Sequence, residues 1–192
     1  TVRLEGPLDA TGGSISNADG ERDRAVHVQG EILLAANSLS IAGGDVHLDG
    51  AIAGAEVVPA TDPPTTRRVD LSIAASGETR LGSSADLRSL SISSSGDSVV
   101  LGGDVVADRS IEIAFEGPGT GTVSNAGTDV TLHTNRVELA ASDSSETDGR
   151  TAQIELGEGV NLDLDAITGT TLAPATLVLD QDGAIDSAAI SR

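Results

Sequence analysis

The sequence predicts an all-β protein, a right-handed parallel β-helix (solenoid) with coils of about 20 residues and loop insertions. Three observations predict it: short alternating aliphatic segments recur along the chain, glycine follows several of them at a fixed position, and aromatic residues are almost absent. The 192 residues include no Cys, Met, Trp or Tyr and a single Phe, so Val, Ile, Leu and Ala must fill the core. A narrow core of stacked aliphatic residues suits this composition better than a thick globular core.

The first repeat consists of two aliphatic residues separated by one position, then glycine two positions after the second, and a third aliphatic residue two positions later. It occurs four times, beginning at Val2, Val26, Val46 and Val99. Glycine in every copy indicates a corner at which a side chain would obstruct the backbone. We expect these segments to occupy equivalent places in their coils.

The second repeat is a shorter alternating strand. Its starts at Leu71, Leu90, Ile111 and Val130 are almost evenly spaced, which indicates a coil of about 20 residues. Period-2 alternation is typical of a strand with one buried face. Because units this short cannot bury their apolar residues alone, neighbouring coils must stack. Further copies begin at Leu39, Val137, Ile154, Leu162 and Leu177.

An antiparallel β-sandwich or barrel is the main alternative fold, because it also has many short strands separated by turns. Such folds usually place aromatic side chains between their sheets, and they do not normally repeat one aliphatic pattern at regular intervals of coil length. Both observations favour the β-helix.

Three stretches rich in turn-forming residues interrupt the repeat, and we predict loop insertions near residues 12–24, 59–68 and 143–150. The Pro-rich stretch 59–68 explains why the strands that begin at Leu39 and Leu71 are further apart than one regular coil. Insertions are also where a rigid rod presents partner contacts. We expect residues 1–192 to form a single β-helical segment that is a fragment of a longer chain.

The charge of the chain argues against two classes of partner. The formal net charge is −19, and all eleven basic residues are Arg. Nucleic acids and anionic membrane surfaces are bound through clustered basic residues, which this sequence lacks. Its longest apolar runs, such as residues 32–36, are too short to cross a bilayer. We therefore expect no nucleic-acid partner and no membrane insertion.

Two runs of the sequence resemble the repeats of filamentous-haemagglutinin-type adhesins and related giant bacterial surface proteins. They are Leu39-Ser-Ile-Ala-Gly-Gly-Asp-Val-His-Leu-Asp-Gly-Ala-Ile52 and Leu177-Val-Leu-Asp-Gln-Asp-Gly-Ala-Ile185. The resemblance is one of repeat style and covers most of the chain. It implies a right-handed β-helix at the cell surface or outside the cell, acting as an adhesin or stalk. The partners would be neighbouring coils, copies of the chain end to end, or a host or cell-surface ligand.

A β-helical polysaccharide lyase or hydrolase is the first alternative to such a non-catalytic rod. Glycoside hydrolysis requires two positioned carboxylates. The sequence has many acids but no motif that singles out such a pair, and it offers no Trp or Tyr on which a sugar ring could stack. We therefore assign no catalytic residues and no cofactor, and we expect the protein not to be an enzyme.

His27 and His47 are weak candidates for a transition-metal site. They occupy the same place in two successive copies of the first repeat, so we expect them to stack on neighbouring coils. Paired imidazoles could bind a metal ion. Because no third ligand is evident, we interpret them as a ladder of solvated, outward-facing side chains.

Asp180, Asp182 and Asp186 are weak candidates for calcium, and a calcium-dependent surface-layer or binding module is the second alternative function. They belong to the run Asp180-Gln-Asp-Gly-Ala-Ile-Asp186. An EF-hand loop would require acidic residues where Val178 and Ala189 are found. We interpret these acids as corner and surface residues.

Overall fold

Short strands follow one another along the described part of the chain. The computed structural model describes residues 2–6, 8–9, 15–16, 25–55, 66–117, 120–142, 153–163 and 176–181. The strands are β1 (Val2–Leu4), β2 (Leu8–Asp9), β3 (Ile15–Ser16), β4 (Val26–Gln29), β5 (Ile32–Leu34), β6 (Ser38–Gly43), β7 (Val46–Asp49), β8 (Ile52–Gly54), β9 (Val69–Ala75), β10 (Thr79–Leu81), β11 (Ser84–Ser94), β12 (Ser98–Leu101), β13 (Val105–Glu116), β14 (Thr120–Asn125), β15 (Val130–Thr134), β16 (Arg136–Ser142), β17 (Gln153–Leu156), β18 (Val160–Asp163) and β19 (Thr176–Gln181).

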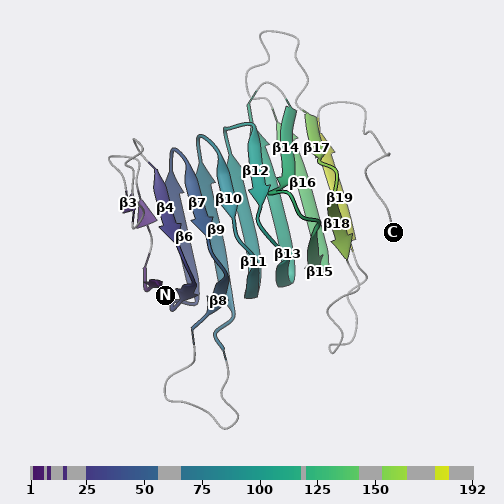
Figure 1. The fold of residues 1–192 in the computed structure, drawn as a ribbon. Coiled ribbons are helices and arrows are strands. Elements are labelled where there is room, and N and C mark those ends of the chain that lie inside the picture. The colour runs from purple at the N-terminus through teal and green to yellow at the C-terminus, as the bar shows by residue number, and fades with distance from the viewer. Residues whose placement is uncertain are drawn as a thin grey trace.

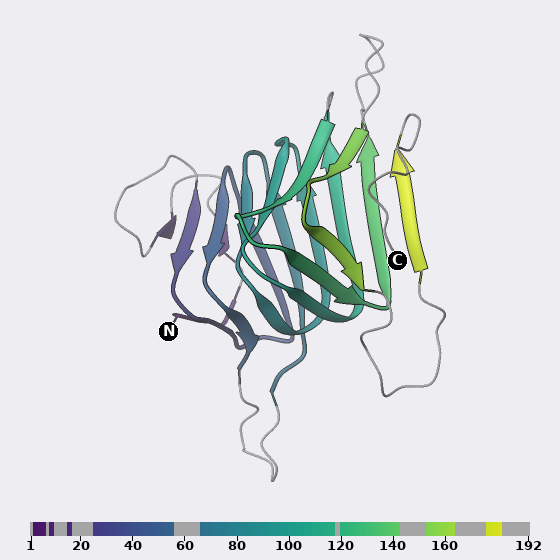
Figure 2. The same cartoon turned by 45° about the vertical axis from the view of Figure 1, so that its right-hand side comes forward.

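These strands form two sheets, and the chain passes repeatedly from one sheet to the other. Sheet B has seven strands in the order β17-β14-β12-β10-β7-β4-β3, and sheet A contains the other 12. The pairings between described strands are parallel, and each strand pairs with its counterpart in the next coil. Figures 1 and 2 show the coils stacked in sequence from the N-terminal to the C-terminal end. The predicted all-β parallel β-helix is confirmed.

Aliphatic residues stack in columns through this core. One column contains Leu39, Leu71, Leu90, Ile111 and Val137, each paired in register with the next. All five side chains are buried. Full burial of one such side chain is worth about 1.5–3 kcal/mol. A column of equivalent residues therefore stabilises every coil through the coils on either side of it.

The order of residues in this column differs from the predicted order at one step. Leu71, Leu90 and Ile111 are consecutive rungs, but the next rung is Val137 and not Val130. Strand β15, which begins at Val130, pairs with the first half of β13, and β16 pairs with the second half. The aliphatic alternation is the same in both strands, so spacing alone could not show which of them continues the column.

The glycine repeat is correct for three of its four copies. Val26 pairs with Val46, and Thr79 pairs with both Val46 and Val99, so these copies share one column of sheet B. The copy at Val2 lies in sheet A instead, where β1 pairs with β5. Strands of both sheets carry the same alternation, and the pattern therefore does not specify the sheet.

The length of a coil varies, although the register is maintained. The steps from Val26 to Val46 and from Thr79 to Val99 are equally long, whereas the step from Val46 to Thr79 is much longer. The step from Val99 to its partner Val123 is slightly longer than a regular one. The regular coils have the predicted length, and additional residues in longer coils leave the columns aligned.

Most of each predicted insertion lies outside the described residues. Within 12–24, the structure describes Ile15–Ser16, which form β3 and pair with β4. Within 59–68, it describes residues 66–68, and the whole of 143–150 lies outside the described part. On either side of residues 56–65, the N–H of Arg67 donates to the carbonyl oxygen of Ala55 at 2.9 Å, so the described residues that flank this stretch lie side by side.

Candidate functional site

A row of polar side chains runs along the outer face of sheet B. Strand alternation places Val26 and Val28 in the core and His27 on the opposite face. His27 is in register with His47 on β7, and His47 is in register with Arg80 on β10. The predicted alignment of the two histidines on neighbouring coils is confirmed, and their rings meet edge to face, with centroids 5.5 Å apart and planes at 82°.

His47 is buried despite its outward direction. Its side chain is 3% exposed, whereas that of His27 is 16% exposed. The prediction that both rings are solvated is therefore wrong for His47. Strands of a sheet lie about 4.8 Å apart, so residues on both neighbouring strands cover the middle member of such a row. Here those neighbours are His27 and Arg80.

Two carboxylates accompany the histidines. Asp49 follows His47 by two positions on β7, and its Oδ2 lies 2.8 Å from Nε2 of His27. Glu78, immediately before β10, places Oε1 3.2 Å from Nε2 of His47 and also pairs with Arg80. Both carboxylates remain about one-third exposed. The row thus brings together imidazole, carboxylate and guanidinium groups from three successive coils.

His27, His47 and Asp49 form the candidate site, which we call the histidine cluster. One potential metal-ligand atom from each residue lies within 4.8 Å of the corresponding atoms of the other two. It is the one group of three such residues found in the part of the chain that the structure describes. The cluster contains the ligand types that borderline divalent metal ions prefer.

The sequence prediction missed Asp49 although a signal for it was present. In the run Val46-His-Leu-Asp49, the histidine and the aspartate are two positions apart. On a strand this spacing places both side chains on one face. Once His27 and His47 are aligned, Gln29 pairs with Asp49, and His27 lies diagonally across from that carboxylate. The third ligand therefore follows from period 2 combined with the register between coils.

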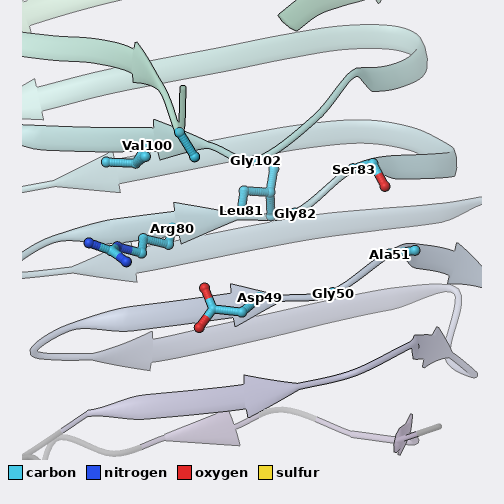
Figure 3. Close-up of a pocket in the computed structure, with 10 residues that line it drawn as sticks. Asp49, Gly50, Ala51, Arg80, Leu81, Gly82, Ser83, Val100 and Gly102 are labelled. Atoms are coloured by element: carbon cyan, nitrogen blue, oxygen red, sulfur yellow. The ribbon is translucent and has the colours of Figure 1, made fainter. Parts of the chain in front are cut away.

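An open pocket of about 500 Å³ lies beside the histidine cluster at the corner of sheet B. Figure 3 shows Asp49 and Arg80 on neighbouring strands, close to the stacked corner residues Gly50 and Gly82. A Cβ atom on Gly50 would lie 1.8 Å from the carbonyl oxygen of Gly30, so the corner has no room for a side chain there. Asp49 belongs to both the cluster and the pocket.

The third histidine has a simpler environment. Nε2 of His133, on β15, lies 4.0 Å from Oδ2 of Asp104. Asp104 also accepts a hydrogen bond from the backbone N–H of Thr131 at 2.8 Å. This pair does not belong to a group of three potential metal ligands within the described ranges.

The calcium candidates cannot be assembled into a site from the described residues. Asp180 lies in β19, where its backbone pairs with Ala140 of β16. Asp182 and Asp186 lie outside the described part of the chain. Their relation to Asp180 therefore stays a sequence prediction.

Comparison of the chain with protein-family models, with curated proteins and with solved structures gives no match. Within the described ranges, no helix has the length and apolar character needed to cross a membrane. The features of the molecule that bear on function are the stack of coils and the polar row on its surface.

Proposed function

We propose that the chain is a non-catalytic structural or adhesive rod of a bacterial cell-surface or extracellular protein. The observation that supports this most is the continuity of sheet B, in which seven strands from successive coils pair in parallel. Backbone hydrogen bonds in such a stack run along its axis, and each contributes about 0.5–1.5 kcal/mol. A stack of this kind suits a rigid spacer that holds the structures at its two ends apart.

The open edges of the described strands support continuation of the rod. Among the described strands, β1, β2 and β3 each have a partner on one side only, and so do β17, β18 and β19 at the other end. Unpaired strand edges readily add further strands. Seven levels at about 4.8 Å extend only about 30 Å. The proposal therefore includes continuation of the stack by further coils or by copies of the chain end to end.

The charge of the chain favours association at the ends over association at the sides. The net charge of −19 makes the outer faces of two chains repel one another. When two chains pair end to end through their backbones, only the few charged groups near the paired edges come close to one another. The resemblance to adhesin repeats supports the surface location, and a host or cell-surface ligand is the partner that an adhesive role requires.

Sedimentation velocity over a range of protein concentrations and salt concentrations tests this assembly. Interference detection is required because Phe115 is the only aromatic residue. End-to-end growth should produce a series of increasingly elongated species that persists at low salt. Lateral association would require salt to screen the acidic faces, because the Debye length falls from about 30 Å at 0.01 M to about 10 Å at 0.1 M. A monomer under every condition would contradict assembly from copies.

A polysaccharide lyase or hydrolase is the alternative, and the pocket beside Asp49 and Arg80 is the observation that favours it. Incubation with acidic and neutral polysaccharides, followed by assays for unsaturated and reducing ends, tests it. We expect no release of either. Release that the substitution Asp49→Asn abolishes would overturn the non-catalytic proposal and locate the reaction in the pocket.

A further inference from the structure

We propose that the histidine cluster binds one divalent transition-metal ion of the zinc type, held between the coils of β4 and β7. The ligands would be one ring nitrogen from each of His27 and His47 and a carboxylate oxygen of Asp49. The proposal goes beyond the rod function, because a site within one chain requires neither assembly nor an external ligand.

The spacing of the three residues suits a single ion. In a tetrahedral zinc site with bonds of about 2.0–2.2 Å, the ligand atoms lie about 3.4 Å from one another. The candidate atoms of the cluster all lie within 4.8 Å of one another, and Nε2 of His27 is 2.8 Å from Oδ2 of Asp49. His27 and Asp49 are the more exposed members of the cluster, so the proposal places the adjustment around an ion in their side chains.

The fold holds the ligands in place before an ion arrives. The coil register fixes His27 opposite His47, and strand period 2 places Asp49 on the same face. The ring of His47 is buried, and Glu78 lies 3.2 Å from its Nε2. A carboxylate beside a metal-binding histidine commonly orients the ring and increases its basicity. Arg80, paired with Glu78, holds that carboxylate in turn.

The ligand set selects among metal ions. Two imidazole nitrogens with one carboxylate suit Zn²⁺, Cu²⁺, Ni²⁺ or Fe²⁺, whereas Ca²⁺ and Mg²⁺ require mainly oxygen ligands. Three protein ligands also leave a coordination position for water or another ligand. Asp49 lines the open pocket and is 34% exposed, so an ion has a route to the site from solvent.

Isothermal titration of the chain with Zn²⁺ in excess Mg²⁺ tests the proposal, because Mg²⁺ occupies the acidic surface without competing for imidazole. We expect one Zn²⁺ per chain. His27→Gln and Asp49→Asn should each weaken binding at least tenfold, whereas His133→Gln, which alters a histidine beside a single carboxylate, should bind like the unchanged protein. Equal binding by all three variants, or no saturable binding, would overturn the proposal.

A second measurement needs no variant. The chain has only three histidines, so their ring signals in an NMR spectrum can be followed individually during a Zn²⁺ titration. We expect the signals of His27 and His47 to shift together and to saturate at one equivalent, while those of His133 stay in place. Equal response of all three rings would show adventitious binding and overturn the site. An equally tight Ca²⁺ complex at the same two rings would overturn the assignment to a transition metal.

Discussion

The ring of Phe115 lies where the side chain of residue 121 would begin: a Cβ atom on Gly121 would come within 2.1 Å of Cγ of Phe115. Phe115 belongs to β13 in sheet A, and Gly121 belongs to β14 in sheet B. The ring is 4% exposed, so it fills the interior between the two sheets near their corner. The glycine provides the space that this one aromatic residue requires.

Gly121→Ala should therefore destabilise the protein, by about 1–3 kcal/mol for an overpacked core. Urea unfolding followed by circular dichroism measures the change. Phe115→Leu removes the edge of the ring and should cost about 1 kcal/mol by itself. In the double variant the two effects should be less than additive, because the smaller leucine makes room for the new methyl group. Strict additivity would mean that the two residues do not compete for one space.

Gly50→Ala should cost more than Gly30→Ala. A Cβ atom at Gly50 would lie 1.8 Å from the carbonyl oxygen of Gly30, which is backbone and cannot rotate away. Gly30 has φ +85 with open space around it, so alanine there carries only the left-handed backbone penalty of about 1–2 kcal/mol. Thermal unfolding of both variants measures the difference. A smaller loss for Gly50→Ala would show that the corner can open.

Thr79→Val should stabilise the protein. Thr79 is fully buried in a column between Val46 and Val99, and its hydroxyl has no hydrogen-bond partner among the described residues. Replacing a buried unsatisfied hydroxyl with a methyl group removes a desolvation cost of about 1–3 kcal/mol. The expected result is a higher urea midpoint with an unchanged slope.

A matched control for Thr79→Val is Ser94→Ala. Ser94 is equally buried, but its hydroxyl accepts a hydrogen bond from the N–H of Gly96 at 3.1 Å. Its loss leaves that donor without its partner, and the urea midpoint should fall. If both substitutions lower the midpoint, the hydroxyl of Thr79 has a partner, such as an ordered water molecule.

Arg3→Pro should block association at the N-terminal end while leaving the chain folded. The N–H of Val2 donates to the carbonyl oxygen of Glu31, and the carbonyl oxygen of Leu4 accepts from the N–H of Ala35, so both residues face the β5 side of the strand. Alternate residues of a parallel strand bond to opposite neighbours, which directs the N–H of Arg3 to the open edge of β1. Proline there removes only that donor. Sedimentation velocity should show fewer long species than for Arg3→Ala.

Val2→Pro is the informative comparison for Arg3→Pro, because it removes the 2.7 Å hydrogen bond to Glu31 inside the sheet. It should lower the thermal midpoint, whereas Arg3→Pro should leave it near that of the unchanged protein. Long species that persist in Arg3→Pro at full strength would exclude β1 as an association edge.

The sequence contained enough information for the fold because the same physical requirement recurs in every coil. Leu71, Leu90 and Ile111 could be recognised as rungs since each must present an aliphatic side chain to one narrow core. The assignment of Val2 to a sheet could not be made in this way, because both sheets impose the same alternation. The pairing of β1 with β5 is what assigns Val2 to sheet A. This pairing depends on the lengths of the corners between strands, which the alternation does not specify.

The candidate site was harder to predict for a related reason. The regular repeat spacing was sufficient to align His27 with His47. The burial of His47 depends on which side chains occupy the strands on both sides, and the long step that brings Arg80 beside it does not follow the regular period. Asp49 could have been found by applying strand alternation to the outer face as well as to the core.

The closure of the chain between Ala55 and Arg67 has a consequence for engineering. The backbone hydrogen bond between these residues holds the two flanks of residues 56–65 together, and Val46 and Thr79, which lie before and after this stretch, pair in register. The free-energy cost of closing a loop rises by only about 0.6 kcal/mol for each doubling of the loop length. A guest peptide or small domain grafted between Ala55 and Arg67 would thus be held at one fixed level of the stack.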